Sequence, residues 1–135
     1  MENTLVIIKP DGVKRNLVGN IMERFENKGL TILQLKMTRL DQKAVEEHYA
    51  HISHLSVWGD IISFMISGPV VIMVLEGHNA VAEVRRLMGT TFDAAAGTIR
   101  GDLALNGTIG DNLIHASDSV ENAQLEIERF SSYLR

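Results

Sequence analysis

The period of the hydrophobic positions changes several times along the chain, and each change marks an expected element. Residues 4–8 form a nearly continuous apolar run rich in β-branched side chains, which is typical of a buried strand, and residues 9–12 then predict a turn. Apolar residues at 33–37 alternate with polar ones, which predicts a strand with one solvated face. The run at 70–75 is apolar on both sides and predicts a central strand. A last short strand is expected at 112–115.

Helical spacing of apolar residues is clearest between residues 18 and 25, and Gly29 follows where a helix end favours positive φ. The same pattern predicts further helices at 41–49 with Asp41 as N-cap, at 60–65, at 81–88 before Gly89, and at 120–134. Before the last of these, Asp118 and Glu121 resemble a capping box.

Residues 90–112 show no clear period and contain four glycines, so they predict a long loop of the kind that is often functional. The remaining elements alternate between strand and helix, which favours an α/β sandwich. A split βαβ, ferredoxin-like arrangement is its natural candidate, although periodicity does not fix the strand order. Because no linker, repeat or low-complexity tract is visible, residues 1–135 are interpreted as one domain.

Composition narrows the functional classes. The chain is 45% hydrophobic and 22% charged with a net charge of -4, which indicates a globular protein and disfavours a basic nucleic-acid binder. The absence of cysteine excludes thiolate catalysis, disulfides and cysteine-bound zinc. The longest apolar run, residues 70–75, is too short for a membrane span, and the first residues do not form a signal peptide. We therefore expect a cytoplasmic protein.

Three cationic side chains are candidates for phosphate binding. Lys9 ends a predicted buried strand before a proline, Arg85 lies on a predicted helix, and Arg100 lies between two glycines. Guanidinium and ammonium groups that converge in this way suit phosphate oxygens, although each alone is more often a solvated surface charge. The common Gly-rich nucleotide motifs are absent.

His115 is the histidine with the strongest signal for chemistry. It follows two apolar residues and precedes a predicted helix start, where free backbone N–H groups attract phosphate. Glu126 borders the buried face of that helix, so its carboxylate could hold one ring nitrogen and leave the other as a nucleophile. The alternative is a core histidine satisfied by a carboxylate. His48, His51 and His54 are interpreted as surface histidines rather than as a metal site.

Taken together, five motifs resemble those of the nucleoside diphosphate kinase family from end to end. They are residues 6–13 (VIIKPDGV), 47–49 (EHY), 67–71 (SGPVV), 97–102 (GTIRGD) and 112–119 (NLIHASDS). The resemblance implies a ferredoxin-like βαββαβ core with an antiparallel four-stranded sheet and added helices. It also implies ping-pong transfer of the γ-phosphate of a nucleoside triphosphate, typically ATP, to a nucleoside diphosphate through a phosphohistidine.

The same resemblance assigns roles to individual residues. His115 would carry the phosphoryl group, Glu126 would orient its ring, and Ser117 would support that carboxylate. The remaining residues that match the family's catalytic and nucleotide contacts are Lys9, Tyr49, Arg85, Thr91, Arg100 and Asn112. Mg²⁺ would be bound mainly by the nucleotide phosphates, with a water-mediated contact to Asp118.

The base-binding residues depart from the family pattern. Val57 occupies the position of a stacking phenylalanine, Trp58 is an alternative stacking group, and Ile61 is expected to line the same cleft. Ile109 matches an apolar nucleotide contact, in a stretch whose length differs from that of the family.

Two other classes are weighed against the enzyme. A non-catalytic ferredoxin-like module would not need Lys9, Arg85, Arg100, His115 and Glu126 together, and a nucleic-acid binder would need a basic aromatic platform that this chain lacks. Family members assemble from dimers, so the resemblance implies a homo-oligomer: a dimer, tetramer or hexamer.

Overall fold

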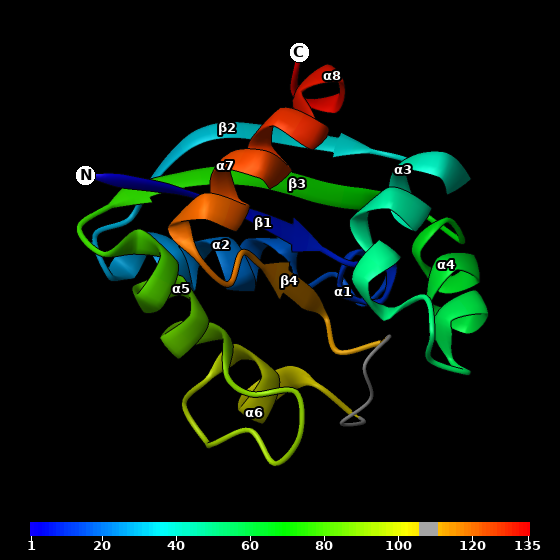
Figure 1. The fold of residues 1–135 in the computed structure, drawn as a ribbon. Coiled ribbons are helices and arrows are strands. Elements are labelled where there is room, and N and C mark those ends of the chain that lie inside the picture. Colours follow the sequence, from blue (N-terminus) through cyan, green and yellow to red (C-terminus); the bar gives the residue numbers. More distant parts are fainter. Residues whose placement is uncertain (106–110) are drawn as a thin grey trace.

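A four-stranded antiparallel sheet lies at the centre of the computed structural model, which describes residues 1–105 and 111–135. Helices cover both faces of this sheet (Figure 1). The strands are β1 (Glu2–Ile8), β2 (Thr31–Thr38), β3 (Val70–Gly77) and β4 (Ile114–Ala116), in the spatial order β2-β3-β1-β4. The sheet has the ferredoxin-like strand order and confirms the predicted fold class, with the strands that are apolar on both sides at its centre.

The helices of the described residues differ widely in length. They are α1 (Pro10–Lys14), α2 (Val18–Asn27), α3 (Gln42–His48), the 3₁₀ helix η1 (Ala50–Ile52), α4 (Trp58–Met65), α5 (Ala80–Met88), α6 (Ile99–Leu103), α7 (Val120–Arg129) and α8 (Ser131–Leu134). Within residues 1–105 and 111–135, no helix has the length and apolar character needed to cross a bilayer.

Strand β1 has apolar side chains on both of its faces because each face packs against a separate core. Val6 and Ile8 contribute to the core beneath α2 and α5, and Leu5 and Ile7 contribute to the core beneath α3, α4, α7 and α8. Successive side chains of a strand point to opposite faces, so the continuous run 4–8 is explained by this two-sided packing.

Two short helices replace segments that the sequence predicts as turn or loop. Helix α1 begins at Pro10 directly after β1, and α6 lies inside the expected loop 90–112. At the start of α6 the Thr98 hydroxyl accepts a hydrogen bond from the Gly101 N–H at 2.9 Å. A Cβ atom at Gly101 would lie 1.8 Å from the Ala95 carbonyl oxygen, so the close approach of these backbones requires glycine. A five-residue helix is too short to show a hydrophobic period.

The closing helix also differs from its prediction. The helical stretch is divided at Phe130 into α7 and α8, and the N-cap is Ser119, whose hydroxyl accepts from the Asn122 N–H at 3.1 Å. Asp118 instead accepts from the Asn122 side-chain amide at 2.6 Å and leaves the backbone N–H groups to Ser119. The prediction that Asp118 caps this helix is therefore wrong by one residue, because the N-cap is Ser119. The Asp41 cap is confirmed, with an Ala44 N–H···Oδ1 distance of 2.8 Å.

Strand β2 carries an uncovered row of apolar side chains. Leu33, Leu35 and Met37 are 45%, 48% and 57% exposed, although their alternation with polar residues predicts a buried face. The strand lies at the edge of the sheet, and α2 packs over only part of it. Its alternation is confirmed, but the face expected to be buried is open in the single chain.

Candidate active site

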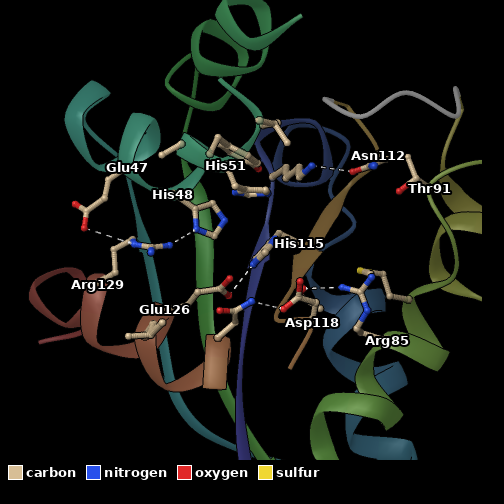
Figure 2. Close-up of a pocket in the computed structure, with 18 of the residues that line it drawn as sticks. Glu47, His48, His51, Arg85, Thr91, Asn112, His115, Asp118, Glu126 and Arg129 are labelled. Carbon is tan, nitrogen blue, oxygen red and sulfur yellow. Dashed lines mark hydrogen bonds and ion pairs between the residues drawn. The ribbon is translucent and has the colours of Figure 1, made fainter. Parts of the chain in front are cut away.

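A cavity of about 600 Å³ opens between the end of β1, helices α3, α5 and α7, and strand β4. Its volume lies within the range of small-molecule sites. The structure brings together most of the predicted site residues on its walls: Lys9, Tyr49, Arg85, Thr91, Arg100, Asn112, His115, Asp118 and Glu126. Figure 2 shows the labelled members of this set around the cavity.

Strand β4 positions His115. It pairs with β1 so that His115 lies opposite Ile7, and this places the ring on the face of the sheet that α3 and α7 cover. Two residues earlier, Leu113 has a φ of +75°, a backbone conformation that residues other than glycine rarely adopt. Its N–H donates to Asp11 Oδ2 at 3.1 Å, and its carbonyl accepts from the Lys9 N–H at 2.8 Å. Asp11 therefore helps to hold this strained turn, a role that the sequence did not indicate.

The imidazole of His115 is held at one nitrogen. Its Nε2 lies 2.8 Å from Glu126 Oε1, and the Ser117 hydroxyl donates to the same oxygen at 2.8 Å. Burial alone raises the pKa of Glu126, but the hydrogen bonds from His115 and Ser117 and the nearby charge of Arg129 outweigh it and lower the pKa below its ordinary value. An ionised carboxylate only accepts, so Nε2 carries the hydrogen and Nδ1 keeps its lone pair.

Lys9 forms a buried part of the cavity wall. Its side chain is 3% exposed, and its ammonium donates to Asn112 Oδ1 at 2.8 Å. Burial, followed by the charge of Arg100, lowers the pKa of Lys9 from 10.5 to about 7. An anion bound beside Lys9 would favour its charged form and raise its pKa again.

The two arginines are anchored on backbone carbonyls. Arg100 donates to the carbonyls of Gly89, Asn112 and Ile114 at 3.1, 3.3 and 2.7 Å. Burial and the charge of Arg85 lower its pKa to about 10, so the guanidinium stays charged at neutral pH. Arg85 donates to the Ala116 carbonyl at 3.0 Å. Fixed cations of this kind are suited to a polyanionic ligand.

Tyr49 offers a hydroxyl group on the cavity wall. Its side chain is buried, and within the described residues its Oη has no hydrogen-bond partner. Burial and the charge of Glu126 raise the pKa of Tyr49, so the group remains a neutral donor. A buried donor without a partner is costly unless a ligand satisfies it.

Of the residues expected near the base, those that the structure describes are not on the cavity wall. Ile61 is buried in the core beneath α4, Val57 is half exposed at the start of that helix, and Ile109 lies outside the described residues. The Trp58 indole N–H donates to the Tyr49 carbonyl at 3.1 Å, so this ring joins α4 to the end of α3. Ser117 lies behind the wall, where its hydroxyl accepts from the Leu5 N–H at 3.2 Å.

His48 is a cavity residue whose interpretation from sequence is wrong. It is 4% exposed, whereas the sequence predicted a surface histidine, because the last turn of α3 directs it towards His115. His51 and His54 are exposed as predicted. The spacing of three between these histidines gave no signal that separated the buried one from the others. Arg129, whose guanidinium contacts His48, was also missed.

Two places on the wall contain possible metal ligands. Nitrogen and oxygen atoms of His48, His115 and Glu126 lie within 4.8 Å of one another, but Lys9, Arg129 and the other cations of the cavity oppose a metal ion there, so we assign none. Asp118 is an exposed carboxylate on the wall, and its hydrogen bond with Asn122 lowers its pKa. An oxygen ligand of this kind suits Mg²⁺.

The fold and the cavity define a ferredoxin-like α/β protein with an oriented histidine among cations suited to phosphate. Residues 2–133 match the family model for nucleoside diphosphate kinase. The chain is 51% identical over 132 residues to a nucleoside diphosphate kinase of Acetivibrio thermocellus and 50% identical over 131 residues to one of Methanocaldococcus jannaschii, covering 96% of this chain in both and 96% and 92% of those proteins. This chain therefore belongs to the nucleoside diphosphate kinase family.

Solved structures agree with this assignment. A nucleoside diphosphate kinase of Encephalitozoon cuniculi matches with a TM-score of 0.91 at 41% identity, covering 96% of this chain and 88% of that one. The enzyme of Halobacterium salinarum, solved in complex with CDP, matches with a TM-score of 0.89 at 45% identity, covering 96% and 86%.

Proposed function

We propose that this chain performs nucleoside diphosphate kinase chemistry through His115, which accepts the γ-phosphoryl group of a nucleoside triphosphate and passes it to a nucleoside diphosphate. The observation that carries this proposal is the 2.8 Å contact of His115 Nε2 with Glu126 Oε1, which leaves Nδ1 as the nitrogen with a lone pair. Ser117 fixes the carboxylate from behind.

In the first half-reaction the Nδ1 lone pair attacks the γ-phosphorus. An N–P bond forms as the bond from phosphorus to the β–γ bridging oxygen breaks, and the nucleoside diphosphate leaves with that electron pair. The hydrogen on Nε2 remains shared with Glu126, which stabilises the positive charge that develops on the ring. The second half-reaction runs the same step in reverse with another diphosphate, which gives a ping-pong sequence.

The remaining contacts are assigned by their chemistry. Lys9, Arg85 and Arg100 stabilise the phosphate charge, and the hydroxyls of Tyr49 and Thr91 donate to oxygen atoms of the nucleotide. Asn112, whose Oδ1 already accepts from Lys9, extends this set towards the sugar. Val57 at the N-cap of α4, Ile61 one turn later in that helix, and Ile109 are the proposed apolar contacts of the base.

Mg²⁺ is proposed as the cofactor, bound mainly by the nucleotide phosphates and reached by Asp118 through water. The exposed, ionised carboxylate of Asp118 on the cavity wall fits an ion that prefers oxygen ligands and retains water. When bound, the ion would neutralise charge on the transferring phosphoryl group.

Labelling with ATP tests the proposed intermediate directly. Incubation with γ-³²P-ATP is expected to give an acid-labile label on the protein, and α-³²P-ATP is expected to give none. Addition of GDP should then remove the label and yield labelled GTP. A protein that shows no label in the presence of Mg²⁺, or keeps it when GDP is added, would contradict the proposal.

We also propose that the chain is a cytoplasmic homo-oligomer, since nucleotide pools are cytoplasmic and β2 offers a surface for a second copy. Among the described residues, one edge of strand β2 has no paired strand, and Leu35 and Met37 are half exposed beside it. The expected assembly is a dimer or a tetramer or hexamer built from dimers.

Positive charge introduced among the exposed apolar side chains of β2 should dissociate the proposed dimer. The double variant Leu35→Lys, Met37→Lys is expected to halve the molar mass of the dimeric unit in light scattering, because two ammonium groups cannot be buried there without partners. Val120→Lys, at an exposed site on α7, is the control and should keep the native mass. An unchanged mass for the double variant would exclude β2 as the interface.

A further inference from the structure

His48 and Arg129 form a side-chain pair behind His115 that the proposed mechanism does not use. Arg129 ends α7 and His48 ends α3, so the pair joins two helices that are distant in sequence. Arg129 Nη1 lies 3.0 Å from His48 Nδ1 (Figure 2). The Arg129 Nε also lies 3.7 Å from Glu47 Oε1.

This contact determines the protonation of His48. A guanidinium group has only donors, so Nδ1 must be the acceptor and cannot carry a hydrogen. The neutral ring then carries its hydrogen on Nε2. Within the described residues Nε2 is buried and has no hydrogen-bond partner.

The His48 ring packs directly against His115. Their centroids are 4.4 Å apart and their planes are 86° from one another. Tyr49 and Phe130 contact other sides of the His48 ring, at centroid distances of 4.8 and 5.2 Å. His48 is therefore enclosed by aromatic rings and forms one wall of the space that His115 occupies.

His48 is also close enough to compete with His115 for its carboxylate. A nitrogen of His48, a nitrogen of His115 and an oxygen of Glu126 all lie within 4.8 Å of one another. A charged or rotated His48 ring would become a second donor to Glu126. His115 would then lose the hydrogen bond that orients it.

We propose that Arg129 is a positioning residue that holds His48 neutral and in one orientation, so that Glu126 pairs with His115 alone. This inference deepens the proposed function and rests on it. Arg129 acts through His48 and is not assigned a contact with the reacting atoms.

Several charged groups surround His48 and determine its response to pH. They are Arg129 and Glu126 on α7, Glu47 and His51 at the end of α3 and in η1, Lys9 after β1, and His115 on β4. Burial, followed by electrostatic interaction with the groups around it, among them the guanidinium of Arg129, lowers the pKa of His48 well below 6.5. Loss of Arg129 would remove one of these charges and expose Nδ1 to a proton, which moves the pKa upwards.

The test compares Arg129→Leu with Arg129→Lys and with Arg86→Leu as the matched control. Arg86 is an exposed arginine on α5 that pairs with Glu83 outside the cavity. Single-turnover formation of the phosphoenzyme is measured against ATP concentration between pH 6 and 8.5. The ¹⁵N and ¹H NMR signals of the histidine rings are recorded over the same range.

For Arg129→Leu we expect phosphorylation to be about tenfold slower at pH 6.5. The ATP concentration that gives half the maximal rate should stay within about twofold of the native value, because Arg129 binds no phosphate in this scheme. The acid limb of the rate profile should move to higher pH. The His48 signals, constant as the Nε2–H form in the native protein, should titrate in the variant.

Arg129→Lys keeps a cation that can donate to Nδ1 and should recover part of the rate, and Arg86→Leu should match the native protein. A native rate, pH profile and His48 spectrum in Arg129→Leu would overturn the inference. If the leucine variant does not fold, the lysine variant serves as the test. Its rate and its His48 spectrum should then differ from those of the native protein, and a native rate together with a native spectrum would overturn the inference. A native protein that forms no phosphoenzyme would contradict the proposed function, and the His48 spectra would still decide whether Arg129 fixes the ring.

Discussion

His115→Asn should lower the rate of phosphoryl transfer by about four orders of magnitude or more and abolish the acid-labile label. Asparagine is similar in size to the first half of the imidazole, as far as Nδ1, so it fits the site although its amide does not reach the Nε2 position that contacts Glu126. It has no lone pair of comparable basicity to attack phosphorus, so the covalent route is lost while the fold is kept. The measurement is the transfer rate together with ³²P labelling, with thermal unfolding as a check on the structure.

The control for this variant is His78→Asn. His78 is exposed in the connection between β3 and α5, away from the cavity, and its replacement should leave the rate and the label unchanged. A labelled His115→Asn protein would show that another group carries the phosphoryl and would overturn the assignment of the nucleophile.

Lys9→Met should lower kcat/KM by about two to three orders of magnitude, since a buried charged donor to the transition state is lost without a water molecule to replace it. At neutral pH the same substitution should instead raise the free energy of unfolding. The unfolded lysine has a pKa of about 10.4, and the folded one has a pKa of about 7. Between these values the unfolded chain binds more protons, so this group's contribution to the free energy of unfolding rises with pH from about 7 to about 10.

Methionine has no such dependence. The variant should therefore be more stable than the native protein below pH 7, with the difference shrinking as the pH rises, apart from the lost hydrogen bond to Asn112. Urea unfolding at pH 6 and at pH 9 measures this difference. A native protein whose stability relative to Lys9→Met does not increase over that range would contradict the lowered pKa.

The same residue predicts proton uptake on nucleotide binding. Phosphate oxygens favour the ammonium form, so the bound nucleotide should raise the pKa of Lys9 and the complex should take up nearly one proton at pH 8. Calorimetry of ADP binding in two buffers of different ionisation enthalpy gives this number. Lys9→Met should show no comparable uptake, and equal values for the two proteins would exclude Lys9 as its source.

Much of the fold could be predicted because burial in this chain follows sequence period. The central strands β1 and β3 lie between two cores, so each has a continuous apolar run. Helices α2 and α5 are followed by Gly29 and Gly89, which have φ values of +82° and +89°. The short helices α1 and α6 could not be predicted, because a turn or two of helix shows no period.

The site could be predicted where a residue's position relative to a strand or helix is itself a signal. This holds for Lys9, His115 and Glu126, which the structure brings to one cavity. His48 could not be separated from His51 by spacing, because its burial depends on the path of α3 relative to β4. Arg129 is one residue before the break between α7 and α8, and from sequence it is indistinguishable from a solvated helix end.

The Ser117 hydroxyl joins the two halves of the reaction centre through β1. It accepts from the Leu5 N–H and donates to Glu126, and Lys9 directly follows the end of the same strand. The serine that fixes Glu126 and the buried Lys9 thus both depend on the position of β1. A shift in the ladder of β1 would therefore impair nucleophile alignment and charge neutralisation together.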